Sequence, residues 1–160
     1  MLLVLAACSA EPARDPIRLR ATVVRPPADT MHFTSPALAR RCAGGEAILL
    51  EAADPHGYGI LVLLRHGDSL ATGSYPLIAL GDSITPRGAQ VSARYVAGDA
   101  PHGFALDSGG VDVEVRAGHG IDARVMGRGL EGAARLRLEA QYTAVPFPAT
   151  GDAVACGFQP

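Results

Sequence analysis

Ser83, Asp99 and His102 are the residues whose types and spacing could carry out covalent chemistry. Ser83 ends the run Gly81-Asp82-Ser83, and Asp99 and His102 bound the run Asp99-Ala100-Pro101-His102. In acyl transfer an imidazole removes the proton of a serine hydroxyl, and a carboxylate holds that imidazole in its orientation. The sequence therefore contains the side chains that a serine esterase needs.

The run Leu77-Ile78-Ala79-Leu80-Gly81-Asp82-Ser83-Ile84-Thr85 resembles the first block of the GDSL-type serine hydrolases. The resemblance implies that Ser83 is the nucleophile and that Asp99 and His102 supply the carboxylate and the base. The chain differs from this family because it contains no Asn, the residue type that provides one oxyanion donor in these enzymes. The family's Asp-x-x-His motif also lies much farther from its serine, within parallel strands that alternate with helices, whereas the residues after Ser83 predict hairpins. We therefore treat the esterase as the alternative interpretation.

Cys8 ends the run Leu5-Ala6-Ala7-Cys8, which resembles the lipobox of bacterial lipoproteins. The resemblance implies cleavage before Cys8 and diacylation of its thiol, the nucleophile in thioether formation. Residues 1–7 would then be the end of a signal peptide, because their apolar run is too short for a membrane-spanning helix. Ser9 after the cysteine implies sorting to the outer membrane of a Gram-negative cell, facing the periplasm or the exterior. The alternative is a short apolar tail with an ordinary cysteine.

Cys42 and Cys156 are an even pair, which predicts one disulfide in an oxidising compartment. A metal-binding role is less favoured, because no Cys-x-x-Cys or Cys-x-x-His spacing is present. Several histidines have an aspartate nearby, but each stands beside Gly or Pro in a predicted turn, so we expect exposed loop residues there. These pairs are Asp54/His56, His66/Asp68, Asp99/His102 and His119/Asp122. The sequence predicts no metal and no cofactor.

The composition excludes some classes of protein. The chain of 160 residues is 48% hydrophobic and has a net charge of -2, which argues against a disordered polymer and a basic nucleic-acid binder. All of its basic residues are Arg. Arg135 and Arg137, opposite Glu139, are interpreted as the solvated face of a strand, with a patch for an anionic glycan or lipid head group as the alternative.

Alternating apolar and polar residues indicate half-buried strands in much of the chain. The clearest are residues 110–117, 121–126 and 134–144, separated by Gly-containing turns. Ser35–Gly44 predicts a short helix, because Ser35 can cap it, Pro36 suits its first turn and Gly44 can end it. We expect an all-β fold, an antiparallel β-sandwich or flattened barrel of about seven to eight strands with at most one short helix.

These observations predict a residual signal peptide at residues 1–7, a lipid-anchored tether at residues 8–16 and a β-sandwich domain at residues 17–160. The expected partner is a membrane, reached through the lipid on Cys8, with a further protein or glycan partner left open and no nucleic acid. The expected function is a non-enzymatic binding or structural module of the cell envelope. The alternative is a GDSL-like esterase that uses Ser83.

Overall fold

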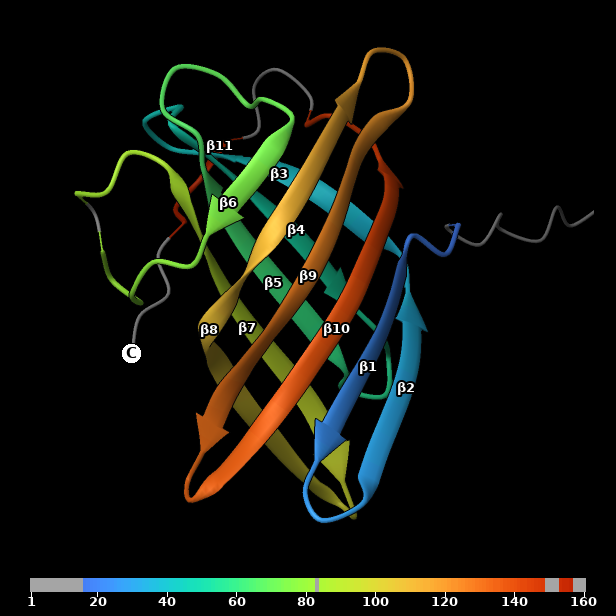
Figure 1. Ribbon diagram of the computed structural model, residues 1–160. Helices are drawn as coiled ribbons and strands as arrows, with labels where there is room; N and C mark the ends of the chain where they lie inside the picture. The colour runs from blue at the N-terminus through green and yellow to red at the C-terminus, as the bar shows by residue number, and fades with distance from the viewer. Residues whose placement is uncertain (1–15, 83, 149–152, 157–160) are drawn as a thin grey trace, which may run out of the picture.

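The computed structural model describes residues 16–82, 84–148 and 153–156, so Cys8 and Ser83 lie outside the described residues. Every regular element in this part of the chain is a β-strand, which confirms the all-β expectation (Figure 1). Within the described ranges no helix is long and apolar enough to cross a membrane. The strands are β1 (Leu19–Arg25), β2 (Asp29–Ser35), β3 (Ala37–Cys42), β4 (Ala47–Ala53), β5 (Gly59–Arg65), β6 (Gly73–Pro76), β7 (Gly88–Ala97), β8 (Ala100–Arg116), β9 (Gly120–Glu131), β10 (Ala134–Val145) and β11 (Ala153–Val154).

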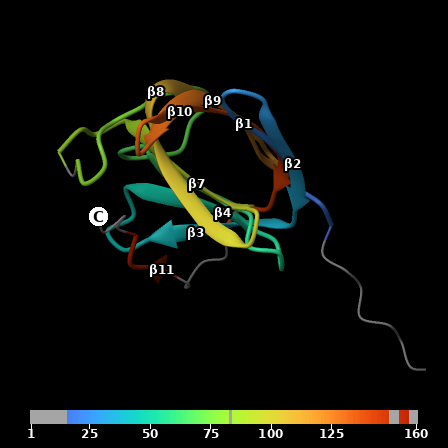
Figure 2. The same cartoon turned by 90° about the horizontal axis from the view of Figure 1, so that it is seen from below.

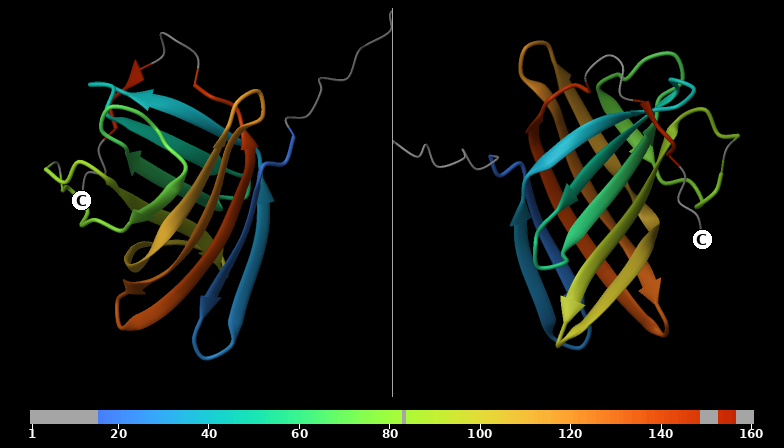
Figure 3. Two further views of the ribbon diagram at one scale, coloured as in Figure 1. Left: turned by 45° about the horizontal axis from the view of Figure 1, so that its top comes forward. Right: turned by 180° about the vertical axis from the view of Figure 1, so that it is seen from behind.

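The strands form one strongly curled sheet with the shape of a half-barrel. Ten strands follow one another in the order β11-β3-β4-β5-β7-β8-β9-β10-β1-β2, and β6 pairs with β8 beside this path. All named neighbours are antiparallel except β11, which runs parallel to β3. Figure 2 shows β8, β9, β10, β1 and β2 as one wall, and β7, β4 and β3 as the wall that faces it. From behind, in Figure 3, the second wall is seen in full.

The predicted sandwich of seven to eight strands is therefore wrong in its finer form. The reason is β8, which pairs with β7 through residues 100–105 and then with β9 from Leu106 onward. The register shifts between Leu106 and Ser108, and a bulge of this kind bends a strand sharply. One long strand thus belongs to both walls, so the walls remain one continuous sheet.

The predicted helix at Ser35–Gly44 is also wrong, because these residues end β2 and form β3. The Ser35 hydroxyl donates to the carbonyl of Ala53 at 2.7 Å, on the strand that pairs with β3, and does not cap a helix. Pairing with β4 and the burial of Ala37 and Cys42 outweigh the weak local preference for helix. Only Pro36 separates β2, at one end of the strand order, from β3 near the other end.

The concave side of the sheet is filled by one hydrophobic cluster that draws residues from both walls. Tyr75, Tyr95 and Tyr142 are the largest fully buried side chains. The Tyr142 hydroxyl on β10 donates to the carbonyl of Ile60 on β5 at 2.9 Å, so the two walls are hydrogen-bonded across the interior. The side chains that alternate with these core residues face outward, as the period of two in the sequence predicts.

A disulfide joins Cys42, at the end of β3, to Cys156, with their Cα atoms 5.3 Å apart. This is the pairing that the sequence predicts. Cys156 lies two residues after β11, and Val154 of β11 is the parallel register partner of Cys42. The bond therefore fixes the C-terminal part of the described chain to the edge of the sheet.

Candidate functional site

Glu131, at the end of β9, is the centre of a polar cluster that joins three hairpins, β7–β8, β9–β10 and β1–β2, at one end of the half-barrel. One of its carboxylate oxygens lies 2.6 Å from His102 Nδ1 on β8. The other accepts a hydrogen bond from the hydroxyl of Tyr95 on β7 and lies 4.0 Å from Arg25 Nε. Tyr95 and His102 are register partners, and their rings stack at 5.3 Å between centroids. The carboxylate thus fixes the orientation of the His102 imidazole.

The cluster keeps Glu131 ionised and Tyr95 protonated. Burial, followed by the hydrogen bond and charge of Glu131, raises the pKa of Tyr95 to about 12. Burial alone would raise the pKa of Glu131. The hydrogen bonds from Tyr95 and His102, with the charges of His102 and Arg25, instead leave this pKa below its usual value. The tyrosine therefore acts only as a hydrogen-bond donor to a carboxylate at neutral pH.

Of the residues of the esterase hypothesis, the structure describes Asp99 and His102 and does not place them side by side. The carboxylate that contacts His102 belongs to Glu131, whereas Asp99 is exposed in the turn between β7 and β8. Ser83 lies outside the described residues. The carbonyl of its neighbour Asp82 accepts from Gln90 Nε2 at 3.4 Å, near the start of β7. Gln90 precedes Tyr95, the register partner of His102, by five strand residues, or about 17 Å at roughly 3.3 Å per residue.

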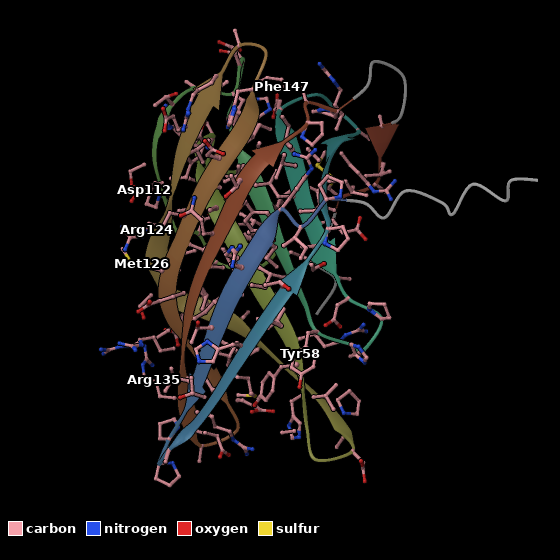
Figure 4. The ribbon with its side chains drawn as sticks, turned by 90° about the vertical axis from the view of Figure 1, so that its right-hand side faces the viewer. Tyr58, Asp112, Arg124, Met126, Arg135 and Phe147 are labelled. Carbon is pink, nitrogen blue, oxygen red and sulfur yellow. A yellow bond between two sulfur atoms is a disulfide. The ribbon has the colours of Figure 1, made fainter. Side chains whose placement is uncertain are left out.

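The second candidate site is an arginine-rich area on the outer face of β9, β10 and β1. The outward-facing charged residues of these three strands are Arg20, Arg124, Arg128, Arg135 and Arg137 against Asp122 and Glu139, and the adjoining β8 adds Asp107, Asp112, Glu114 and Arg116. Figure 4 shows Arg124, Met126 and Arg135 standing out from this wall, along the length of the sheet.

Arg128 on β9 and Arg137 on β10 stand directly opposite each other in this area. Arg137 Nε lies 3.7 Å from a carboxylate oxygen of Glu139, and Arg135 pairs with Asp107 at 2.7 Å. Arg128 makes no ion pair with any described residue. Two like charges directly opposite each other in an antiparallel pair are destabilising, so no favourable contact between these two side chains explains their placement.

An open hollow of about 600 Å³ lies beside this arginine pair. Its lining includes Gly109, Gly110 and Gly127, from which no side chain rises. A Cβ on Gly109 would lie 2.1 Å from the carbonyl oxygen of Met126, and one on Gly127 would lie 2.4 Å from that of Ser108. Glycine is required there because the bulged strands approach each other closely, and the hollow is a consequence.

A third feature is an apolar groove of about 560 Å³ at the point where the described chain begins. Pro16 lines this groove together with Leu38 and Phe147, whose side chains are 41% and 45% exposed. In Figure 4 Phe147 lies near one end of the sheet and Arg135 near the other. The groove and the arginine-rich area therefore lie on different parts of the surface.

Sequence reasoning identified His102 and Arg137 but not Glu131 or the pairing of Arg128 with Arg137. Glu131 follows His102 by 29 residues and lies on another hairpin, so no local pattern connects them. The opposition of Arg128 and Arg137 depends on the register across the β9–β10 turn. Counting residues outward from that turn, at Gly132 and Ala133, would have found it.

Comparison of the chain with protein-family models, with curated proteins and with solved structures finds no significant match. Candidate roles for the protein thus depend on its own residues. Within the described residues no group of three or more His, Cys, Asp or Glu side chains could hold a metal ion. Three surfaces of the described residues are therefore candidates for a role: the Glu131 cluster, the arginine-rich area and the apolar groove.

Proposed function

We propose that the protein is a lipid-anchored protein of the bacterial cell envelope that acts as a non-enzymatic binding module through the outer face of its sheet. One observation carries the binding role. Five arginines, drawn from three neighbouring strands, gather on the outside of a sheet whose concave side is filled by its core. A ligand therefore meets the outer wall, where guanidinium groups offer charge-assisted hydrogen bonds.

Location outside the cytoplasm is supported by the disulfide between Cys42 and Cys156. Such bonds persist in oxidising compartments and are rare where thiol systems keep cysteines reduced. The bond joins positions 114 residues apart, so the fold gains a large constraint on its unfolded chain from it. A protein that depends on this constraint is suited to the envelope.

Anchoring through Cys8 is supported by the groove at Pro16. The eight residues 8–15 span at most about 26–29 Å when fully extended. A lipid on Cys8 would therefore hold the Leu38 and Phe147 surface within reach of the bilayer. Exposed apolar side chains of this kind are suited to contact with a membrane surface.

Acyl labelling in cells that express the protein from its own gene tests the anchor. A palmitate analogue should label the wild-type protein and the matched Ser9→Ala variant, and both should sediment with membranes. The Cys8→Ala variant should lose the label and move to the soluble fraction. Label retained in Cys8→Ala, or absent from the wild type, would refute the lipid anchor.

A further inference from the structure

We infer that the hollow beside Arg128 and Arg137 is a binding site for the acidic groups of an anionic polysaccharide. This inference rests on the proposed binding role and names its ligand class. The site itself does not require the lipid anchor, because the hollow lies on the outer wall formed by β8, β9 and β10. The preference for a polysaccharide over a lipid surface does use the anchor. The inference depends on three properties of the site: an arginine, Arg128, that makes no ion pair with any described residue, an open floor and a position in a longer row of arginines.

The charge of the site is the first argument. The Cβ atoms of directly opposed residues in an antiparallel pair are about 4.5–5.5 Å apart, so the guanidinium groups of Arg128 and Arg137 can reach one anion together. Asp112 and Glu139 also line the hollow, and Glu139 lies 3.7 Å from Arg137 Nε, whereas Arg128 makes no ion pair with any described residue. A ligand carboxylate or phosphate between the two groups would relieve their repulsion and accept hydrogen bonds from both.

The floor of the site is the second argument. Ser74 and Ser108 place hydroxyl groups at the hollow, and the glycines leave the backbone accessible between them. Ser108 Oγ accepts a hydrogen bond from Arg135 at 3.0 Å, so its own hydrogen is free to donate. Met126, 41% exposed, adds an apolar wall. Hydroxyls, guanidinium groups and a small apolar surface together suit a sugar that carries an acidic group.

The extent of the arginine-rich area favours a polymer over a small anion. Arg135 and Arg137 are two residues apart on β10, which places their Cα atoms about 7 Å apart, and Arg124 lies four residues from Arg128 on β9. An extended chain with a repeating negative charge can meet several of these groups at once. Neighbouring carboxylates at Asp107, Asp112 and Glu139 disfavour the dense phosphates of nucleic acid.

A membrane of anionic lipids is a less favoured ligand for the arginines than an anionic polysaccharide. The apolar groove that lies at Pro16, where the tether joins the domain, contains Phe147. Phe147 and Arg135 lie near opposite ends of the sheet, as Figure 4 shows. A bilayer that contacts the groove therefore leaves the Arg135 end of the area pointing away from it. That end faces the compartment in which soluble or wall-bound glycan chains are found.

Binding to polygalacturonate tests the inference, with neutral dextran, phosphatidylglycerol vesicles and inorganic phosphate as the other probes. The full-length protein should bind polygalacturonate in a salt-sensitive manner and should not bind dextran. The Arg128→Gln/Arg137→Gln variant should lose at least about tenfold in affinity, equivalent to about 1.4 kcal/mol. The matched Arg41→Gln/Arg94→Gln variant removes two exposed arginines from the other wall and should bind within about twofold of the wild type.

Thermal unfolding accompanies the binding assay as a check on folding. The Arg128→Gln/Arg137→Gln variant should be at least as stable as the wild type, because it removes a like-charged pair. Equal polygalacturonate binding by the two double variants would overturn the inference, as would binding to the vesicles or to phosphate alone. Loss of the acyl label with polygalacturonate binding retained would refute the lipid anchor and support the site.

Discussion

Replacing Glu131 by Ala is expected to destabilise the fold by about 3 kcal/mol, although the residue lies at the end of a strand. The carboxylate accepts hydrogen bonds from Tyr95 and His102, and the Tyr95 side chain is fully buried. A buried hydroxyl without its acceptor costs about 1–3 kcal/mol, and a hydrogen bond to a charged group contributes about 1.5–3 kcal/mol. For a chain of this size that loss lowers the melting temperature by about 6–12 °C.

The effect of Glu131→Ala should depend on pH. Because the pKa of Glu131 is lowered in the folded protein, its ionised form stabilises the fold above the unfolded-state pKa of about 4.3–4.5. That contribution is lost as the pH falls through the lower, folded-state pKa. The stability difference between the wild type and the variant should therefore be largest near neutral pH and should narrow in acid.

Urea unfolding measures the free energy of unfolding of four proteins at several pH values: the wild type, Glu131→Ala, Tyr95→Phe and the double variant. The double variant should be more stable than the two single losses predict by addition, since both remove the same hydrogen bond. Glu114→Ala, which removes an exposed carboxylate paired with Arg116 at 2.8 Å, is the matched control and should change stability little. A loss below about 0.5 kcal/mol for Glu131→Ala, or a loss that does not change with pH, would refute the reasoning.

Three further variants test the disulfide, the bulge and the esterase alternative. Cys42→Ser should lower the free energy of unfolding by about 4 kcal/mol, because the bond closes a loop of 114 residues, and an unchanged urea midpoint would contradict this. Gly129→Ala would place a Cβ 2.0 Å from the carbonyl oxygen of Ala105, so unfolding by urea should show a loss of about 3 kcal/mol or more, whereas Gly103→Ala, with 3.4 Å to its nearest neighbour, should be tolerated. Ser83→Ala should leave the turnover of a short-chain nitrophenyl ester unchanged from the wild type, and activity that disappears in this variant would make the esterase the first hypothesis.

The sequence predicts the strands of this fold well wherever one face of a strand is buried. Residues 134–144 alternate strictly between apolar and polar types, and β10 occupies Ala134–Val145. The apolar runs at residues 47–53 and 58–65 correspond to β4 and β5. In β4 and β10 burial on the concave side imposes the alternating pattern. β5 is apolar on both faces, because Leu63 is buried as well as its neighbours Val62 and Leu64.

The errors occur where distant partners decide the structure. Ser35 and Pro36 satisfy the local rules for the start of a helix, yet β4 supplies hydrogen bonds to residues 37–41. The single curled sheet depends on β8 exchanging one partner for another at Leu106. The pairing of residues 37–41 with β4 depends on a strand outside that segment, and so does the change of partner along β8. Neither can be read from the local sequence.

The candidate site shows the same division between local and distant information. Parity of the cysteines was enough to predict the bond between Cys42 and Cys156, because only these two remain once Cys8 is assigned to the lipobox. The esterase alternative implies that Asp99, three residues away, is the partner of His102, whereas the carboxylate that contacts His102 is Glu131 at the start of the β9–β10 turn. Asp99 lies in the exposed turn before β8, whereas His102 lies on β8 with its ring stacked on the ring of Tyr95.

Register connects the fold to the proposed binding surface. The tight turn between β9 and β10 sets Arg128 opposite Arg137, and the bulge at Leu106–Ser108 sets Ser108 beside Arg128. Because successive side chains in a strand point to opposite faces, a shift of one residue in β10 would turn Arg137 toward the core and Leu136 toward water. Burial of Leu136 and Leu138 therefore holds the arginine between them on the outer face. The apolar core thus offsets the repulsion between the two guanidinium groups, and a ligand that neutralises them would add to the stability of the fold.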